Sequence, residues 1–432
     1  MTLDRRGFLS AAGALSAGAV LSGCRGFTGR GSDDGAAGEL TFTTWGTDSE
    51  LDGFRRGIAA FTAANPGSDV KLNAVPYEQM FQNIDAQLQS GDAPDVFRVD
   101  YDNLGTYAGR GQLLNLQDLV DLSLGEDFTP AMWQAVQFDD APHGVPHHTD
   151  TSAILYNKAA LRSAGVRSVP TTLESAWTWG EFEEVALKLR ADLPDDRYPF
   201  AYNWQQTGVT RWLSWLFQAG GRFLDDDLVT PAIDSAAGRR AVDFTASFFP
   251  RRLVPANSSV KSTVYASDVF FSETVAMTFA GAFLLPDAAE LAPFEWGATF
   301  SPRDERGGGD LGGNALVATA DARSPELAAE FLSFMVQRDQ MNDFCTRSSL
   351  LPTRKDLVEG GIEFAVRPEL STTFIQQAST VEPSDAAQVA SRSMAGINAV
   401  LADQLELAFA KGQSTAETLS KLSDGIAEAT AR

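Results

Sequence analysis

The sequence predicts an α/β protein of two lobes, each with a central sheet flanked by helices. Its 432 residues are 44% hydrophobic and 21% charged, which is enough chain for two domains with cores of their own. Strand and helix patterns alternate with short connections along residues 39–100, as in a right-handed parallel sheet. Residues 144–158 separate two such α/β regions, so we expect this segment to cross between the lobes.

The first α/β region contains three strand patterns and two helix patterns. Apolar and polar residues alternate at 40–44, which predicts a strand. Thr47 and Glu50 have the spacing of a capping box, and the apolar residues after them lie on one helical face. After a second strand and helix, residues 94–100 form the third strand.

Residues at the strand ends of this region are candidates for ligand binding. In open parallel sheets, ligands bind beyond the carboxyl ends of the strands. This rule selects Trp45, Glu78, Asp100 and Tyr101. For Trp45, the alternative is an ordinary core aromatic.

The crossing segment places an acidic residue between the lobes. Ile154, Leu155 and Tyr156 form an apolar run typical of a buried strand, and Pro142, Gly144 and Pro146 interrupt the chain before it. We expect one strand here, with Asp150 facing the gap between the two halves. A ligand at Asp150 would touch both lobes.

The second α/β region also contains helix and strand patterns. Thr178 and Glu181 form another capping box, Trp212 belongs to a buried helix face, and residues 275–279 are a continuous apolar strand. Helices are expected after Ser324 and Ser414, each of which caps its helix.

The N-terminal residues have the features of an export signal. Arg5 and Arg6 form a twin-arginine start, and a small, apolar run follows them. Residues 21–24 resemble the lipobox of bacterial lipoproteins, which implies cleavage before Cys24 and lipidation of its thiol. We therefore expect a signal peptide at 1–23, a flexible tether at 24–38, and a protein lipid-anchored outside the cytoplasmic membrane.

Charge and motifs exclude several classes of function. The formal net charge of -23 argues against nucleic acid, which is bound by clustered Lys and Arg. No Lys follows a Gly, so the chain has no Walker A motif and is not a P-loop ATPase. The glycine-rich residues 307–312 have no strand before them and no helix after them, so we interpret them as a flexible loop. No cofactor is expected.

The histidines raise the question of a metal site. All three lie in one segment beside acidic residues: His143, His147 and His148, with Asp139, Asp140 and Asp150. Because that segment is loop and strand, the spacing of the histidines does not guarantee a shared face, and we expect no zinc site. A serine triad is not expected because GxSxG is absent. A glycosidase with paired carboxylates remains open, since sequence spacing does not exclude it.

Several motifs together resemble a known family. They are residues 61–72, 91–96, 144–158, 179–182, 218–221, 275–281, 324–334 and 351–354. In order and spacing they are similar to the extracellular solute-binding proteins of ABC importers, in the carbohydrate-binding family 1, the maltose-binding-protein-like group. The resemblance covers nearly all of the chain after the export signal.

The resemblance implies a periplasmic binding protein of type II with a ligand cleft between its lobes. It implies lobes at 39–149 with 303–330 and at 150–302 with 331–432. The implied function is capture of a mono- or oligosaccharide and its delivery to a membrane permease whose separate ATPase supplies the energy. We expect a monomer and no enzymatic activity. The alternatives are a polar non-sugar solute such as a glycerophosphate or a polyamine, with Arg98 and Arg354 as the residues for a phosphate, and an extracellular glycan-cleaving enzyme.

The resemblance also implies site residues. The acid before the crossing strand is a sugar ligand in the family, and here it is Asp150. Phe283 stands where the family often has a stacking Trp, and Trp204 is the expected platform of residues 203–206. No stacking Trp follows Trp296, so a long maltodextrin-like ligand is not expected. The full predicted ligand set is Trp45, Glu78, Asp100, Tyr101, Asp150, Trp204, Gln206, Phe283, Asn314 and Arg354. Trp204→Ala is expected to weaken sugar binding without unfolding.

Overall fold

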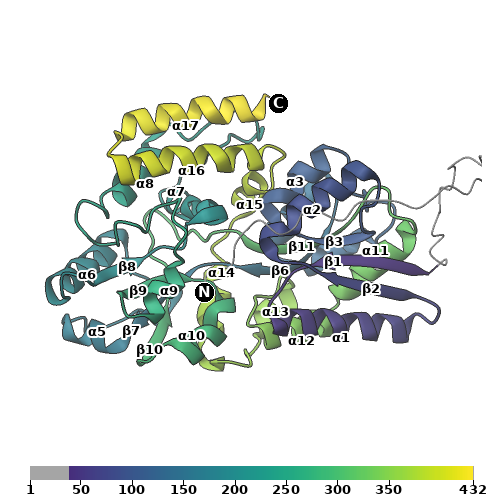
Figure 1. Cartoon of the computed structure of the whole chain (residues 1–432), viewed down its shortest axis with the longest axis horizontal. Helices are drawn as coiled ribbons and strands as arrows, with labels where there is room; N and C mark the ends of the chain where they lie inside the picture. Colours follow the sequence, from purple (N-terminus) through teal and green to yellow (C-terminus); the bar gives the residue numbers. More distant parts are fainter. Residues whose placement is uncertain (1–37, 432) are drawn as a thin grey trace, which may run out of the picture. The chain divides into compact units, whose positions relative to one another are not determined.

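The computed structural model describes residues 38–431, which form one compact unit with two main sheets (Figure 1). The five-stranded sheet has the order β2-β1-β3-β11-β6, and the four-stranded sheet has the order β10-β7-β9-β8. The predicted export signal at 1–23, Cys24 and most of the predicted tether lie outside the described residues. The lobe boundaries remain a prediction.

The first sheet begins as the sequence predicts. Strands β1 (Glu39–Thr44), β2 (Asp69–Ala74) and β3 (Val96–Asp100) are parallel, with β1 in the middle. Helices α1 (Asp48–Ala64) and α2 (Tyr77–Ser90) connect them.

Local capping fixes where these first helices begin and end. The predicted capping box of α1 is confirmed, because Thr47 and Glu50 bond reciprocally. Helix α2 ends at Gly91, which adopts the left-handed conformation at φ 78°.

Two antiparallel strands complete this sheet from distant parts of the chain. Strand β11 (Gly312–Ala318) pairs with β3, and β6 (Val145–Asp150) pairs with β11. The sheet is therefore mixed. The register places Asn314 opposite Asp100 and Gly312 opposite Asp150, so residues of three separate segments meet at one edge.

The crossing segment forms two strands where one was expected. Strand β6 belongs to the first sheet, while β7 (Ala153–Asn157) lies between β10 (Trp296–Thr299) and β9 (Val275–Ala280) in the second. Only Thr151 and Ser152 separate β6 from β7. Asp150 is thus the last residue of the first sheet before the chain enters the second.

Helices cover the second sheet, and the core between the sheet and these helices contains many aromatic side chains. Strand β8 (Tyr198–Ala201) pairs with β9, and α6 (Trp179–Asp192) begins at the predicted capping box of Thr178 and Glu181. Trp212, at the end of the 3-10 helix η3 (Gln206–Trp212), is fully buried, which confirms its predicted core position.

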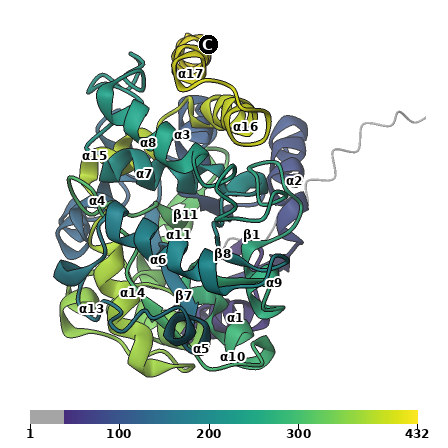
Figure 2. The same ribbon diagram turned by 90° about the vertical axis from the view of Figure 1, so that its left-hand side faces the viewer.

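The C-terminal part is helical, as predicted. Helices α16 (Met394–Lys411) and α17 (Thr415–Thr430) lie side by side in both views (Figures 1 and 2). Ser414 caps α17 by accepting from Glu417 N–H. Ser324 is the N-cap residue of α11 (Pro325–Met335), as predicted, although its side chain makes no capping bond. Pro325 starts α11 at a position that needs no N–H donor.

The remaining elements connect these layers. They are α3 (Tyr101–Gly109), α4 (Pro130–Gln134), α5 (Lys158–Ser163), α7 (Leu213–Gln218), α8 (Ala236–Ala246), α9 (Ala266–Phe271), α10 (Leu285–Leu291), α12 (Arg338–Ser348), α13 (Lys355–Gly360), α14 (Ser371–Ala378), α15 (Pro383–Val389), β4 (Gln137–Phe138) and β5 (Ala141–Pro142). Helix α12 packs against α1 and β6. Within residues 38–431, no helix has both the length and the apolar character needed to cross a bilayer.

Candidate functional site

Asp150 is the centre of a buried polar cluster. Its relative exposure is 4%, and Arg211 Nη2 donates to its Oδ2 at 3.3 Å. Arg211 comes from η3, and its Nε lies 3.4 Å from Asp310 Oδ2. One guanidinium therefore sits between two carboxylates from separate segments.

Asp310 anchors the link between β6 and β7. The backbone N–H of Ser152 donates to Asp310 Oδ1 at 2.8 Å, and the Ser152 hydroxyl donates to Oδ2 at 3.1 Å. Thr151 Oγ1 adds a bond of 3.3 Å to Oδ1. Neither Asp310 nor Arg211 is among the predicted ligand residues. A signal for Asp310 was present, because it is the only charged residue in the glycine-rich run that we interpreted as a flexible loop.

The first sheet contributes a second acidic group. Asp100, the last residue of β3, accepts from Tyr77 Oη at 2.9 Å and from the Asn314 side-chain amide. Asp102 accepts from Asn398 Nδ2 at 3.0 Å. Burial raises the pKa of both Asp100 and Asp102, and the positive charge of Arg211, which also bonds Asp150, opposes this rise for both groups.

Aromatic side chains lie beside this cluster. The half-buried Trp45 follows β1, and its ring centroid is 5.3 Å from that of Tyr77 and 5.7 Å from that of Phe81. The guanidinium carbon of Arg98 lies 4.4 Å from the Trp45 ring centroid. Such a tilted aromatic group can offer a ring face or edge to an apolar ligand surface.

Phe283 lies next to Asp150 in the second sheet's half. A side chain at Gly281 would collide with both Asp150 Oδ1 and the Phe283 ring, so Gly281 permits their close approach. Phe283 is only partly buried. The structure thus brings Asp150 and Phe283 together, and Asp100 with Asn314.

Burial makes the cluster electrostatically unusual. It raises the pKa of Asp150 to about 7, and the negative charge of Asp310 adds to this, while Arg211 opposes it. Burial, with the charge of Asp100, also raises the pKa of Asp102 to about 7. The pKa of Asp100 is raised by the same loss of solvent.

Two aromatic residues of the predicted set belong to the core. Trp204 has 0% exposure, its Nε1–H donates to Ser258 O at 2.9 Å, and its ring packs between Tyr202 and Phe409. No ring face is left for a ligand, so we withdraw Trp204 as a stacking platform. Tyr101 is also buried, and its hydroxyl donates to His148 O at 3.1 Å.

Three other predicted residues are not part of the cluster as described. Arg354 lies elsewhere, where its guanidinium bonds Asp127 and Asp356. Glu78 is exposed on the first turn of α2. Gln206 begins η3, but its side chain lies outside the described part of the structure.

The histidine segment forms a buried network around Arg98. Arg98 Nη2 bonds Glu50 Oε1 at 2.7 Å and lies 3.1 Å from His148 Nε2. Burial and the charge of Arg98 lower the pKa of His147 to about 3 and that of His148 well below its usual range, so both rings are neutral near pH 7. In the described part of the chain, no three His, Cys, Asp or Glu side chains are grouped to hold a metal ion.

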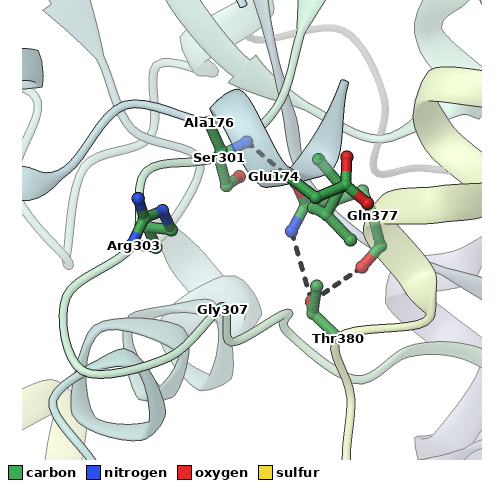
Figure 3. A pocket seen from close by; sticks show the side chains of 8 residues that line it. Glu174, Ala176, Ser301, Arg303, Gly307, Gln377 and Thr380 are labelled. Carbon is green, nitrogen blue, oxygen red and sulfur yellow. Dashed lines mark hydrogen bonds between the residues drawn. The ribbon is translucent and has the colours of Figure 1, made fainter.

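A pocket of about 150 Å³ is lined by Ser301, Gly307, Gln377 and Thr380, among others (Figure 3). Gln377 bridges its lining, since its Oε1 accepts from Ser301 N at 2.9 Å and its Nε2 donates to Thr380 Oγ1 at 3.3 Å. None of the predicted ligand residues lines this pocket. We therefore retain the polar cluster at Asp150 as the candidate site.

A comparison with protein families decides the assignment. The family described as bacterial extracellular solute-binding protein matches residues 47–342. The chain belongs to this family. The match includes β3, β6, η3 and the loop before β11, which together supply Asp100, Asp150, Arg211 and Asp310.

Curated relatives of this solute-binding protein share modest identity with it. A Streptomyces antibioticus lipoprotein is 26% identical over 305 residues, which are 68% of this chain and 66% of the relative. The diacetylchitobiose-binding protein DasA of Streptomyces coelicolor is 29% identical over 140 residues, 32% of each chain. The chain thus matches less than two thirds of the length of either relative.

Solved structures show the same two-lobed fold, with sheets flanked by helices. The GacH receptor of Streptomyces glaucescens, solved unliganded and with acarbose, has a TM-score of 0.74 and 20% identity and covers 90% of this chain and 98% of its own. UgpB from Mycobacterium tuberculosis, solved with glycerophosphocholine, has a TM-score of 0.75 and 21% identity. The similarity covers 91% of this chain and 98% of the UgpB chain. The predicted α/β, two-lobed fold is confirmed.

Proposed function

We propose that this solute-binding protein captures a carbohydrate, a mono- or oligosaccharide, and delivers it to the permease of an ABC importer. The observation that carries the proposal is the meeting of buried acidic groups and aromatic rings from distant segments, with Asp150 and Arg211 at its centre. Sugars offer hydroxyl groups to such planar polar groups and C–H faces to aromatic rings. Family membership and the sugar-binding names of relatives support it.

The ligand set that we propose follows the geometry of the cluster. It consists of Trp45, Tyr77, Asp100, Asp150, Arg211, Phe283 and Asn314. Asp150 would accept hydrogen bonds from hydroxyl groups, and Arg211 would donate hydrogen bonds to them. Trp45 and Phe283 would contact the apolar faces of the sugar ring. Glu78 and Gln206 stay secondary proposals, because the structure gives neither a bond to the cluster.

A phosphate-containing solute is the second candidate, because UgpB has been solved with glycerophosphocholine. A phosphate needs cationic side chains or N–H groups to bind. The arginines proposed for it already have carboxylate partners, Arg98 with Glu50 and Arg354 with Asp127. The cluster therefore favours a ligand without a phosphate.

Membrane attachment through Cys24 is part of the same proposal. The twin-arginine start and the lipobox-like residues 21–24 support export and lipidation, and one relative is named as a lipoprotein. A lipid anchor would hold the binding protein beside its permease partner outside the cytoplasmic membrane.

A thermal-shift screen against mono- and oligosaccharides, followed by calorimetry on each hit, tests the function. Ligand binding raises the melting temperature because the ligand binds only the native state. Chromatography of the recovered sugar separates binding from cleavage, since a binding protein leaves the sugar intact. Absence of any shift across neutral and charged sugars, or release of cleaved product, would contradict the proposal.

Trp45→Ala tests the site, with Trp133→Ala as the matched control. Both tryptophans are partly buried, but Trp133 stacks on Phe128, at a ring distance of 5.9 Å, outside the cluster. We expect Trp45→Ala to weaken binding about tenfold, since a ring contact is worth about 1 kcal/mol or more. Trp133→Ala should leave the dissociation constant unchanged.

A further inference from the structure

The cluster at Asp150 contains more acidic than basic groups. Arg211 is the positive group whose charge acts on all four carboxylates, those of Asp100, Asp102, Asp150 and Asp310. Arg98 also acts on Asp100, but Arg98 is already bonded to Glu50. When the four carboxylates are ionised, the cluster carries an excess of negative charge in a buried setting.

One carboxylate oxygen of this cluster has no hydrogen-bond partner among the side chains that the structure describes. Asp150 Oδ1 is buried and accepts no hydrogen bond from these residues, which exclude the side chains of Gln206 and Thr207, although Oδ2 of the same group is bonded to Arg211. Buried carboxylate oxygens are normally bonded, because leaving one unsatisfied costs free energy. Oδ1 faces Gly281 and the partly exposed Phe283, where a Cβ atom on residue 281 would lie only 2.3 Å from Oδ1.

The electrostatics point to the charge of that donor. Burial raises the pKa of Asp150 and of Asp102 to about 7, the neighbouring carboxylates of Asp310 and Asp100 add to this, and the charge of Arg211 opposes it, so a further positive charge beside these groups would favour their ionised form. A neutral hydroxyl would satisfy Oδ1 but leave the excess negative charge unbalanced. A protonated amine would do both, through a charge-assisted N–H bond.

We propose that the ligand of this site is an amino sugar or another polyhydroxylated compound with a protonated amine, whose N–H donates to Asp150 Oδ1. The inference rests on the proposed carbohydrate-binding function and narrows it to amine-bearing ligands. Trp45 and Phe283 would hold the ring, and the acidic groups would select the ammonium group. A quaternary ammonium has no N–H and does not fulfil this role.

Isothermal calorimetry with matched pairs of sugars tests the proposal. The pairs are chitobiose with diacetylchitobiose, glucosamine with N-acetylglucosamine, and galactosamine with galactose, and glycerophosphocholine is a separate arm. In the first two pairs N-acetylation removes the charge of the amine and adds an acetyl group, and in the third pair a hydroxyl replaces the amine without added bulk. We expect the amine-bearing member of at least one pair to bind at least about tenfold more tightly at about pH 7.

Asp150→Asn identifies the selecting group, with Asp52→Asn as the control on an exposed acid. Asparagine keeps the shape of the side chain but removes its charge, so the amine preference should fall to less than about threefold. Asp52→Asn, whose side chain is 62% exposed in α1, should keep the full preference. If Asp150→Asn does not fold, Asp102→Asn is compared in the same way.

The outcomes separate this inference from the proposed function. Equal or tighter binding of the neutral sugars would overturn the amine selection and leave carbohydrate binding intact. An amine preference that survives in Asp150→Asn, or in Asp102→Asn where Asp150→Asn does not fold, would overturn the role of the acidic cluster. Binding of glycerophosphocholine alone would overturn both, whereas binding of no member of the panel would overturn the amine selection and leave carbohydrate binding to the wider sugar screen.

Discussion

Asp150 and Trp204 are both almost fully buried, but burial has opposite consequences for them. One carboxylate oxygen of Asp150 has no hydrogen-bond partner in the described part of the structure, so a ligand can donate a hydrogen bond to it. Trp204 has its indole N–H bonded to Ser258 O and its ring packed against Tyr202 and Phe409. Both the N–H group and the ring of Trp204 have partners inside the core, so this residue contributes to packing.

Trp204→Ala should therefore destabilise the fold. Removal of a fully buried indole leaves a cavity, which costs about 3–5 kcal/mol in the free energy of unfolding. Urea denaturation of the purified variant measures this directly. A variant with unchanged stability but weakened sugar binding would restore the stacking role that the sequence suggested.

The pKa of Asp150 makes a pH-dependent prediction. The carboxyl is raised to about 7 in the native protein and titrates near 4 in the unfolded chain, so between these values the native state holds a proton that the unfolded state releases. Its contribution to stability is therefore lost as the pH rises from about 4 through about 7. Asp150→Asn removes this pH-dependent loss of stability, because asparagine does not titrate.

Urea denaturation of the ligand-free protein over that pH range measures the effect. We expect the stability of Asp150→Asn, relative to the original protein, to increase with pH. Asp52→Asn is the control, and its curve should run parallel to that of the original protein. Parallel curves for Asp150→Asn would show that its carboxyl titrates normally.

A buried ion pair attaches helix α1 to the first sheet. Arg98 and Glu50 side chains are 3% and 9% exposed, and Arg98 Nε also donates to Asn314 Oδ1 at 2.9 Å. This bond network joins α1, β3 and β11, although the three elements are far apart in sequence. It also holds Asn314 in place to bond Asp100.

Glu50→Ala should be much more costly than the loss of a surface pair. It leaves the Arg98 charge buried without its carboxylate, which costs about 3–5 kcal/mol in the free energy of unfolding. Asp52→Ala removes the exposed pair with Arg55 on the same helix and should cost less than about 1 kcal/mol. Equal costs in chemical denaturation would contradict this account.

The whole molecule brings together its site from elements of both sheets. Asp150 ends β6 in the first sheet, and the bonds from Thr151 and Ser152 to Asp310 hold the turn into β7 of the second. Arg211 then connects Asp150 and Asp310 from a third segment. Each sheet alone would carry only part of the proposed site.

The proposed membrane anchor is a property of the whole molecule as well. Expression of the full chain in a bacterium that processes lipoproteins, with a labelled fatty acid, should give a labelled protein in the membrane fraction. Cys24→Ser should lose the label and leave the membrane fraction, because a serine carries no thiol to be acylated. Label retained by Cys24→Ser would place the lipid elsewhere.

Sequence patterns determined the local elements of this protein. The α/β alternation of residues 39–100, the capping boxes at Thr47 and Thr178, and the helical C-terminal part all depend on contacts between neighbouring residues. Periodicity and capping report such contacts directly. The strand-end rule also selected Asp100 and Trp45 for the proposed site, since it depends only on strand direction.

Only the tertiary structure decided which side chains meet. The pairing of β11 with both β3 and β6 brings Asn314 to Asp100, and no local pattern predicts a register between such distant segments. The same holds for Arg211 and Asp310, which looked like parts of a buried helix and a loop, and for Trp204, whose neighbours come from other parts of the chain. Burial and electrostatics depend on those distant contacts, so the chemistry of the site is a property of the folded chain.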